Sequence, residues 1–303
     1  MITRDAGAFF AFAARCAADF GPATARAAFL VSPDGFARAE QSATDNRYMA
    51  GAADFDPAGA QAQHRALQLA LGEELPTICF PGHAGAPDAL FPNNVFATVP
   101  GRLIVGRMRH EVRRREAGRS DIRGFFRDTL GYAETDLSAQ PHPCELTGAL
   151  VIDRVRGLGY CGLSERCDAE GAALMHAAFG LRATLLFDLA PGEYHANVLL
   201  AVLAGRAALV CPSGFADAAV AEAVAGFYAP HAIVLSKAET AAFAGNAICL
   251  RDGSVWMSAR AAAALSPASR AGLERAGFLL RGVALDAIEA AGGSLRCCVA
   301  EIF

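Results

Sequence analysis

Four pairs of apolar runs recur along this chain at intervals of about 50 residues, and this spacing limits the fold more than any other feature. Each pair has two runs rich in β-branched and aliphatic residues, joined by a short turn with glycine, which is typical of a β-hairpin. The hairpins begin at Asn94, Gly148, Asn197 and Asn246. A further strand, "SLRCCVAEIF", is predicted from Ser294, about one more interval along the chain.

A segment with helical spacing follows each hairpin. Several of these segments open on Ser or Asp and several close on Gly, which are the preferred residues at helix ends. They cover 120–131, 168–180, 216–228 and 266–277. The N-terminal part predicts a strand at 27–33, a helix at 57–72 and a strand at 76–82, which are the missing pieces of a ring whose last strand closes on its first unit.

We therefore expect a single α/β domain over residues 1–303, with about five units around an axis and an N-terminal helix at residues 1–22. No Pro-rich or Ser-rich linker divides the chain. The apolar stretch near the N-terminus is interrupted by Arg15 and Asp19, whereas a membrane-spanning helix needs about 20 apolar residues. A signal peptide is also disfavoured, because the leading Arg4 is offset by Asp5. No membrane association is expected.

Charge and cysteine content exclude several classes of protein. The net charge is −4, and the basic residues gather only at 106–116, a run without aromatic residues that we interpret as a solvated face and not as a nucleic-acid site. The nine cysteines are an odd number without a close CxxC pair, which argues against a disulfide framework and against a zinc site. We expect a cytoplasmic protein without a metal or another cofactor.

Polar residues with catalytic potential stand at the starts of the units. They are Asp88 and Asn94 in the first, Glu145 in the second, His195 and Asn197 in the third, and Cys297 in the last. If the units surround an axis, these side chains converge at one end of it. A cysteine thiolate can act as nucleophile, a histidine can stabilise it and transfer protons, and a carboxylate can orient the histidine. The remaining carboxylate, Asp88, favours a substrate with positive charge or several N–H donors, such as a guanidinium or ureido group.

Each of these residues also has a purely structural interpretation. A cysteine in a strand is commonly a small core residue, and a histidine is commonly satisfied by local hydrogen bonds. Glu145 could cap a turn, and Asp88 could form an Asx-turn. Spacing alone leaves both interpretations open.

Five ordered motifs resemble those of the guanidino-group modifying enzymes, a superfamily of arginine deiminases, dimethylarginine hydrolases and amidinotransferases. The "FPNN" and "HxN" versions look closest to the citrulline-utilisation hydrolase (CtlX-like) branch. The motifs are "PDALFPNNVFAT" at 87–98, "ELTGALVIDR" at 145–154, "GLSERCD" at 162–168, "YHANVL" at 194–199 and "GGSLRC" at 292–297. This resemblance implies the pentein fold, an α/β propeller with fivefold pseudo-symmetry, which agrees with the repeat.

The resemblance also implies roles for individual residues. It assigns the nucleophile to Cys297, the general acid/base to His195, its acidic partner to Glu145, the grip on the substrate nitrogens to Asp88, and the grip on a substrate carboxylate to Arg166. Asn94 and Asn197 are expected to bind substrate as well. Asn197 stands where arginine deiminases carry a carboxylate, and an amide suits a neutral ureido group better than a cation. Cys298 is expected to pack in the core, on the opposite face of the strand from Cys297.

The predicted function is hydrolysis of a C–N bond in a linear amidine or ureido compound, an amino acid similar to citrulline or arginine, through a covalent intermediate on Cys297. An amidinotransferase, in which an amine replaces water, and a non-catalytic binding protein on the same fold are the alternatives. The expected partner is a small amino-acid substrate, without nucleic acid or membrane. A homodimer stays an option that the sequence does not decide.

Overall fold

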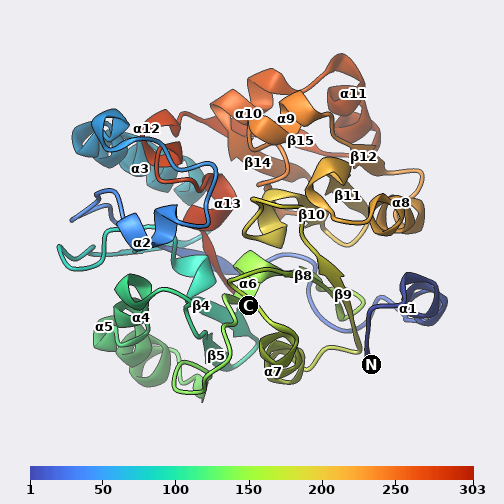
Figure 1. Ribbon diagram of the computed structural model, residues 1–303, viewed down its shortest axis with the longest axis horizontal. Coiled ribbons are helices and arrows are strands. Elements are labelled where there is room, and N and C mark those ends of the chain that lie inside the picture. The colour runs from blue at the N-terminus through green and yellow to red at the C-terminus, as the bar shows by residue number, and fades with distance from the viewer.

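The computed structural model describes residues 1–303 and every side chain but that of Ala52. Five small sheets lie around a common centre in these residues (Figure 1). The strands, grouped by sheet, are β4 (Phe96–Val99), β5 (Arg102–Val105) and β6 (Ala133–Asp136); β7 (Leu150–Asp153), β8 (Leu158–Leu163) and β9 (Ala183–Asp188); β10 (Leu200–Leu203), β11 (Ala207–Val210) and β12 (Ala232–Val234); β13 (Ile248–Arg251), β14 (Ser254–Ser258) and β15 (Leu279–Val283); and β16 (Ala300–Ile302), β2 (Ala27–Val31) and β3 (Thr77–Phe80).

Every sheet repeats one topology. Its first two strands pair antiparallel, and its third strand adds parallel to the second. In the fifth sheet the C-terminal strand β16 pairs antiparallel with β2, and β2 pairs parallel with β3. The first strands of neighbouring sheets contact one another, as β7 does with β10, β10 with β13, and β16 with β4. The predicted ring of five units, closed by the last strand, is confirmed.

A helical segment connects the second and third strands of each sheet, since a parallel connection needs a crossover. These helices lie on the outside of the ring (Figure 1). They are α3 (Pro57–Gly72), α4 (Glu111–Ala117) and α5 (Ser120–Gly124) with a π-helical turn at Phe125–Thr129, α7 (Ala169–Phe179), α8 (Ala218–Phe227), and α10 (Ala259–Ala264) with α11 (Pro267–Arg275). Short helices complete the chain: α2 (Glu40–Ala43), α6 (Leu146–Ala149), α9 (Lys237–Ala241), α12 (Asp286–Glu289) and α13 (Leu295–Cys298).

The N-terminal segment differs from its prediction. A helix is predicted for residues 1–22, but α1 covers only Ala6–Ala13 and follows a two-residue strand, β1 (Ile2–Thr3), that extends the second sheet beside β9. Asp5 caps the helix by accepting a hydrogen bond from the backbone N–H of Ala8 at 2.9 Å. None of the described helices combines the length and the apolar character that a membrane crossing requires.

The C-terminal cysteines also differ from their prediction. Cys297 and Cys298 lie in the helical turn α13 and not in a strand, because β16 begins only at Ala300. Consecutive side chains of a helix point about 100° apart, so the two thiols still diverge, although for another reason than the one expected. Cys298 packs in the core, where its Sγ lies 3.5 Å from the backbone oxygen of Ser294.

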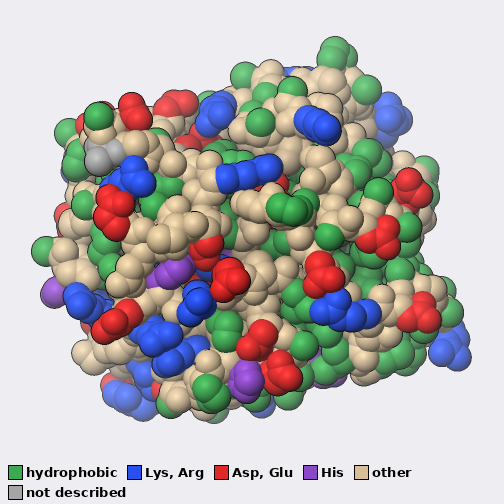
Figure 2. All heavy atoms as spheres, viewed as in Figure 1, with side chains coloured by type: hydrophobic (Ala, Val, Ile, Leu, Met, Phe, Trp, Pro, Cys, Tyr) green, Lys and Arg blue, Asp and Glu red, His purple; other side chains and the backbone are tan. Residues whose placement is uncertain are grey.

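The surface seen in Figure 2 carries charges of both signs, with Lys and Arg side chains interspersed among Asp and Glu. Basic side chains are most frequent over α4 and α5, and the run 106–116 that is predicted as a solvated face includes most of α4. Arg113 contradicts that prediction, because it is 2% exposed and pairs with Glu116 at 2.8 Å. Its side chain extends from α4 to line a small cavity beside Cys297.

Candidate active site

Cys297 reaches the centre of the ring because α13 follows a tight turn at a glycine pair. Gly292 has a φ of 75°, and a Cβ on it would stand 2.3 Å from Nδ2 of Asn46, so only glycine fits there. Cys297 is 1% exposed and lines a small central cavity. Burial raises the pKa of this thiol, although a hydrogen bond from the Asn246 amide counteracts part of the effect.

His195 and Glu145 form a buried pair. Nε2 of His195 lies 2.8 Å from Oε2 of Glu145, and both side chains are 0% exposed. Burial lowers the pKa of His195, although Glu145 counteracts this. Nδ1 of His195 has no hydrogen-bond partner in the described part of the chain. The carboxylate therefore fixes one ring nitrogen, and the other is free for a substrate.

Glu145 is held as an anion by its surroundings. Burial opposes its charge, but Arg166 and His195 outweigh burial and lower the pKa of Glu145 to about 2. Oε1 accepts a hydrogen bond from the backbone N–H of Arg109 at 3.0 Å, and Oε2 lies 3.5 Å from NH1 of Arg166. An ionised Glu145 can stabilise a protonated His195, as the prediction requires.

Asp88 lies 3% exposed beside the same cavity. Its Oδ2 accepts a hydrogen bond from the Ser42 hydroxyl at 2.6 Å, while Oδ1 has no partner among the described residues. Burial raises the pKa of Asp88, and the nearby Arg113 counteracts the effect. A buried acceptor without a donor costs free energy, so Oδ1 is a ready partner for a substrate N–H group.

Asn94 adds a second acceptor at this cavity. Its Oδ1 is buried and without a partner in the described part of the chain. A Cβ on Gly148 would stand 2.8 Å from this oxygen and 2.9 Å from Nδ1 of His195. The amide oxygen of Asn94 and Nδ1 of His195 therefore lie near the same position, and both fit there because Gly148 has no side chain.

Arg166 lies at the cavity, but its guanidinium already has a carboxylate partner. Its NH2 and Nε donate to Asp45 at 2.6 and 3.1 Å, and NH2 also donates to the backbone oxygen of Ser42 at 3.0 Å. His110 contacts the same carboxylate through Nε2 at 3.1 Å. Asp45 therefore accepts the guanidinium hydrogen bonds of Arg166 that are predicted to go to a substrate carboxylate.

Asn197 lies next to Cys297 but does not line the small cavity in front of it. Its Nδ2 donates to the backbone oxygen of Thr147 at 3.0 Å. Its Oδ1 lies 3.9 Å from Sγ of Cys297. The amide lies beneath the thiol, where it supports the nucleophile, and its predicted contact with substrate stays a prediction.

Asn246 was missed as a site residue. Its Nδ2 lies 3.3 Å from Sγ of Cys297 and donates to the backbone oxygen of Asn197 at 2.9 Å, and its Oδ1 accepts from the backbone N–H of Arg296 at 3.0 Å. The sequence contains a signal for it, since Asn246 opens the fourth hairpin as Asn197 opens the third. The same hydrogen bond recurs one unit earlier, where Asn197 donates to Thr147, so the repeat itself points to this position.

The central cavity is nearly closed. Its volume is about 10 Å³, room for roughly one water. The lining residues are Ser42, Asn46, Met49, Asp88, Phe91, Asn94, Arg113, Arg166, Tyr194, Ala291, Gly293 and Cys297. Three of them belong to the segment 42–49 that follows the start of α2, and the cavity as it stands is smaller than an amino acid.

A separate cluster has the ligand types of a metal site. One ligand atom from each of His142, Asp168 and Glu170 lies within 4.8 Å of the others. None of the three lines the central cavity, and Asp168 already caps α7 through a 2.6 Å hydrogen bond from the backbone N–H of Gly171.

Comparison with known proteins decides the family. The family model described as N,N dimethylarginine dimethylhydrolase, eukaryotic, matches residues 32–303. This chain belongs to the dimethylarginine dimethylaminohydrolase family. It is 31% identical to the N(G),N(G)-dimethylarginine dimethylaminohydrolase of Mycobacterium tuberculosis (strain ATCC 25618 / H37Rv) over 260 residues, which are 85% of this chain and 80% of the relative.

Solved structures of low identity share the fold. The N-terminal domain of ArgZ, an arginine dihydrolase from the ornithine–ammonia cycle in cyanobacteria, matches with a TM-score of 0.79 at 20% identity over 91% of this chain and 97% of that one. A dimethylarginine dimethylaminohydrolase in adduct with S-methyl-L-thiocitrulline matches with a TM-score of 0.71 at 21% identity over 92% and 100%. The predicted superfamily and pentein fold are confirmed, whereas the citrulline-utilisation branch stays a prediction.

Proposed function

We propose that this protein hydrolyses a C–N bond in the guanidino group of an arginine-like amino acid, with an N-methylated arginine as the first substrate to test. The observation that carries the proposal is the meeting of Cys297 with two buried acceptors without partners, Oδ1 of Asp88 and Oδ1 of Asn94, at one cavity. A guanidinium offers several N–H donors and a positive charge to such a pair. Membership of the dimethylarginine dimethylaminohydrolase family supports the same chemistry.

In the proposed order of events, His195 transfers the protons and Cys297 attacks the substrate carbon. His195, neutral at pH 7 because burial lowers its pKa, takes the thiol proton at Nδ1, and the Cys297 thiolate forms a bond to the guanidino carbon. The protonated His195, stabilised by Glu145, returns the proton to the departing amine as the C–N bond breaks. His195 then takes a proton from water as the water oxygen bonds to the thiouronium carbon, and the C–S bond breaks to restore the Cys297 thiol. Dimethylarginine plus water would thereby yield citrulline and dimethylamine.

Binding of the cation also favours the reactive form of the thiol. The raised pKa of Cys297 means that the free site holds mainly a thiol at neutral pH. A positively charged guanidinium beside Sγ lowers the free-energy cost of ionising the Cys297 thiol. The hydrolysis therefore begins only when substrate is bound.

A citrulline-like substrate is the second candidate. The amides of Asn94 and Asn197 near Cys297 match a neutral ureido group, because an amide can both donate and accept. An amidinotransferase and a non-catalytic binding protein are the further alternatives, and both are separated by product analysis.

The test is incubation of the full chain with asymmetric dimethylarginine, arginine and citrulline, followed by mass spectrometry of the products. We expect citrulline and dimethylamine from the first, and no product with Cys297→Ser. Added glycine reveals a transferase if guanidinoacetate forms from arginine. Release of ammonia only from citrulline would favour the second candidate, and an active Cys297→Ser variant would overturn the mechanism.

A further inference from the structure

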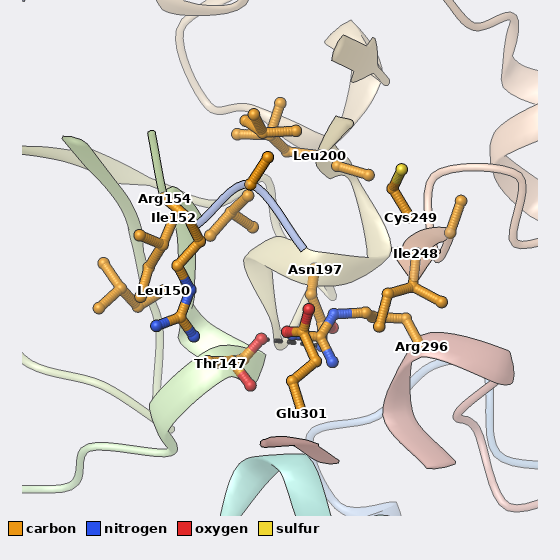
Figure 3. Close-up of a pocket in the computed structure, with 15 residues that line it drawn as sticks. Thr147, Leu150, Ile152, Arg154, Asn197, Leu200, Ile248, Cys249, Arg296 and Glu301 are labelled. Carbon is orange, nitrogen blue, oxygen red and sulfur yellow. Dashed lines mark hydrogen bonds and ion pairs between the residues drawn. The ribbon is translucent and has the colours of Figure 1, made fainter. Parts of the chain in front are cut away.

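A second pocket lies further along the ring axis, on the other side of the residues that support Cys297. The inner strands line it, through residues of β7, β10, β13 and β16. Thr147 and Asn197 also line it, and the same Asn197 lies 3.9 Å from Sγ of Cys297. The pocket and the active-site cavity are therefore separate spaces divided by one layer of side chains. Figure 3 shows Thr147, Asn197, Arg296 and Glu301 gathered in its middle.

The charges in this pocket do not balance. Its only charged lining residues are Arg154, Arg296 and Glu301, which together carry one net positive charge. Arg296 and Glu301 pair with each other, since NH2 of the arginine lies 2.9 Å from Oε2 of the glutamate. The charge left over is that of Arg154.

Arg154 has no carboxylate partner among the described residues. Its NH1 donates to the backbone oxygen of Thr98 at 3.1 Å, and its guanidinium lies over the ring of Phe303 at 4.1 Å. No hydrogen bond uses its Nε or NH2 in the described part of the chain. Burial lowers the pKa of Arg154 to about 10, although Glu301 counteracts the effect. A half-buried guanidinium with two donor nitrogens that no protein acceptor uses matches the two oxygens of a carboxylate.

We propose that this second pocket binds a small monocarboxylate through Arg154, with the short apolar part of the ligand against the aliphatic side chains of the inner strands. A ligand with one negative charge neutralises the pocket, whereas a dianion would leave one excess negative charge near the carboxylate of Glu301. The aliphatic lining residues are Leu150, Val151, Ile152, Leu200, Val202 and Ile248. The cavity volume of about 50 Å³ suits a ligand of the size of propionate. The proposal does not depend on the proposed function.

The probe is sodium propionate, compared with sodium chloride at equal ionic strength, in thermal unfolding of the full chain. A ligand that binds only the folded state raises Tm, by about 2–4 °C once its concentration exceeds Kd several-fold. Arg154→Gln is expected to lose this rise. Arg206→Gln is the matched control, because its guanidinium also lies over a phenylalanine ring, Phe278, at 4.0 Å, but outside the pocket.

Arg166→Gln separates this pocket from the active site, where a carboxylate could also bind. We expect the propionate effect to persist in Arg166→Gln. A rise that survives in Arg154→Gln, one that disappears in Arg166→Gln, or no difference between propionate and chloride in the native chain would overturn the proposal.

Glu301→Gln keeps the proposal testable if Arg154→Gln does not fold. This change keeps a polar partner for Arg296 and raises the net charge of the pocket from one to two positive charges. Sulfate, a dianion, should then raise Tm more than it does in the native chain, at equal ionic strength. An unchanged response to sulfate would contradict the assignment.

Discussion

Nε2 of His195 lies 2.8 Å from Oε2 of Glu145, and neither side chain is exposed to solvent. The pair joins the second unit of the ring to the third, since Glu145 precedes α6 and His195 precedes the turn at Ala196–Val198. Removal of either partner leaves the other buried without its hydrogen bond. The proton chemistry of the site therefore depends on a contact between two units of the repeat.

Glu145→Gln tests this contact. The neutral amide cannot stabilise a protonated His195, so we expect kcat to fall by about 10²-fold or more, the range of general acid–base catalysis. The measurement is steady-state kinetics with asymmetric dimethylarginine. Glu170→Gln, an exposed position on α7, serves as the control and should keep its activity.

The same residue makes stability depend on pH. The folded pKa of Glu145 is about 2, below the value of about 4.3 in an unfolded chain, so its stabilisation is present above the unfolded value and is lost as pH falls through the folded one. Urea unfolding between pH 4.5 and 2.5 should show a smaller loss of stability in Glu145→Gln than in the native chain. An equal loss of stability in the two proteins would show that carboxylates other than Glu145 cause the loss at low pH.

Gly148→Ala should disable the site without large damage to the fold. The added Cβ would stand 2.8 Å from Oδ1 of Asn94 and 2.9 Å from Nδ1 of His195, closer than carbon can approach either atom. We expect kcat/KM to fall by about 10²-fold, because small displacements in a catalytic site are costly. Gly226→Ala on α8, where a Cβ meets nothing within 4 Å, is the matched control. Equal activity of the two variants would contradict the geometry.

The reactivity of Cys297 should increase towards alkaline pH. Burial raises its pKa, so the rate of alkylation by iodoacetamide should still be rising at pH 9. Asn246→Ala removes a donor to Sγ and should move the profile to still higher pH. Peptide mass spectrometry follows the label. Cys298→Ala should leave the profile unchanged, since the thiol of Cys298 packs in the core.

Asp45→Asn tests whether Asp45 competes with substrate for Arg166. Loss of the carboxylate frees the guanidinium fork, so we expect KM to fall several-fold with little change in kcat. Kinetics with an arginine-like substrate and with a decarboxylated analogue measure the effect, which should be absent for the analogue. A rise in KM would instead assign to Asp45 a contact with the substrate itself.

The repeat in the sequence was sufficient to predict the architecture. Hairpin, helix and strand recur because each unit must bury an apolar face that it cannot cover alone, and this requirement is written in the alternation of apolar runs and turn residues. The repeat also predicts that the last strand closes the ring, and β16 does so by pairing with β2. Local patterns were weaker guides to element ends, as α1 and the short helical turn α13 show.

Most of the candidate site residues, though not Asn246, are predicted from the sequence, but the contacts among them are decided by the tertiary structure. Cys297, Asp88, Asn94 and Arg166 meet at one cavity, with His195 and Glu145 paired beside it. No local pattern could show that Asp45 fills the fork of Arg166, or that Asn246 supports the thiol, because these contacts join residues more than 50 positions apart. The sequence determines which side chains each unit presents to the axis. Only the closure of the ring determines which of them touch, since that depends on packing between units and not on the order of residues within one.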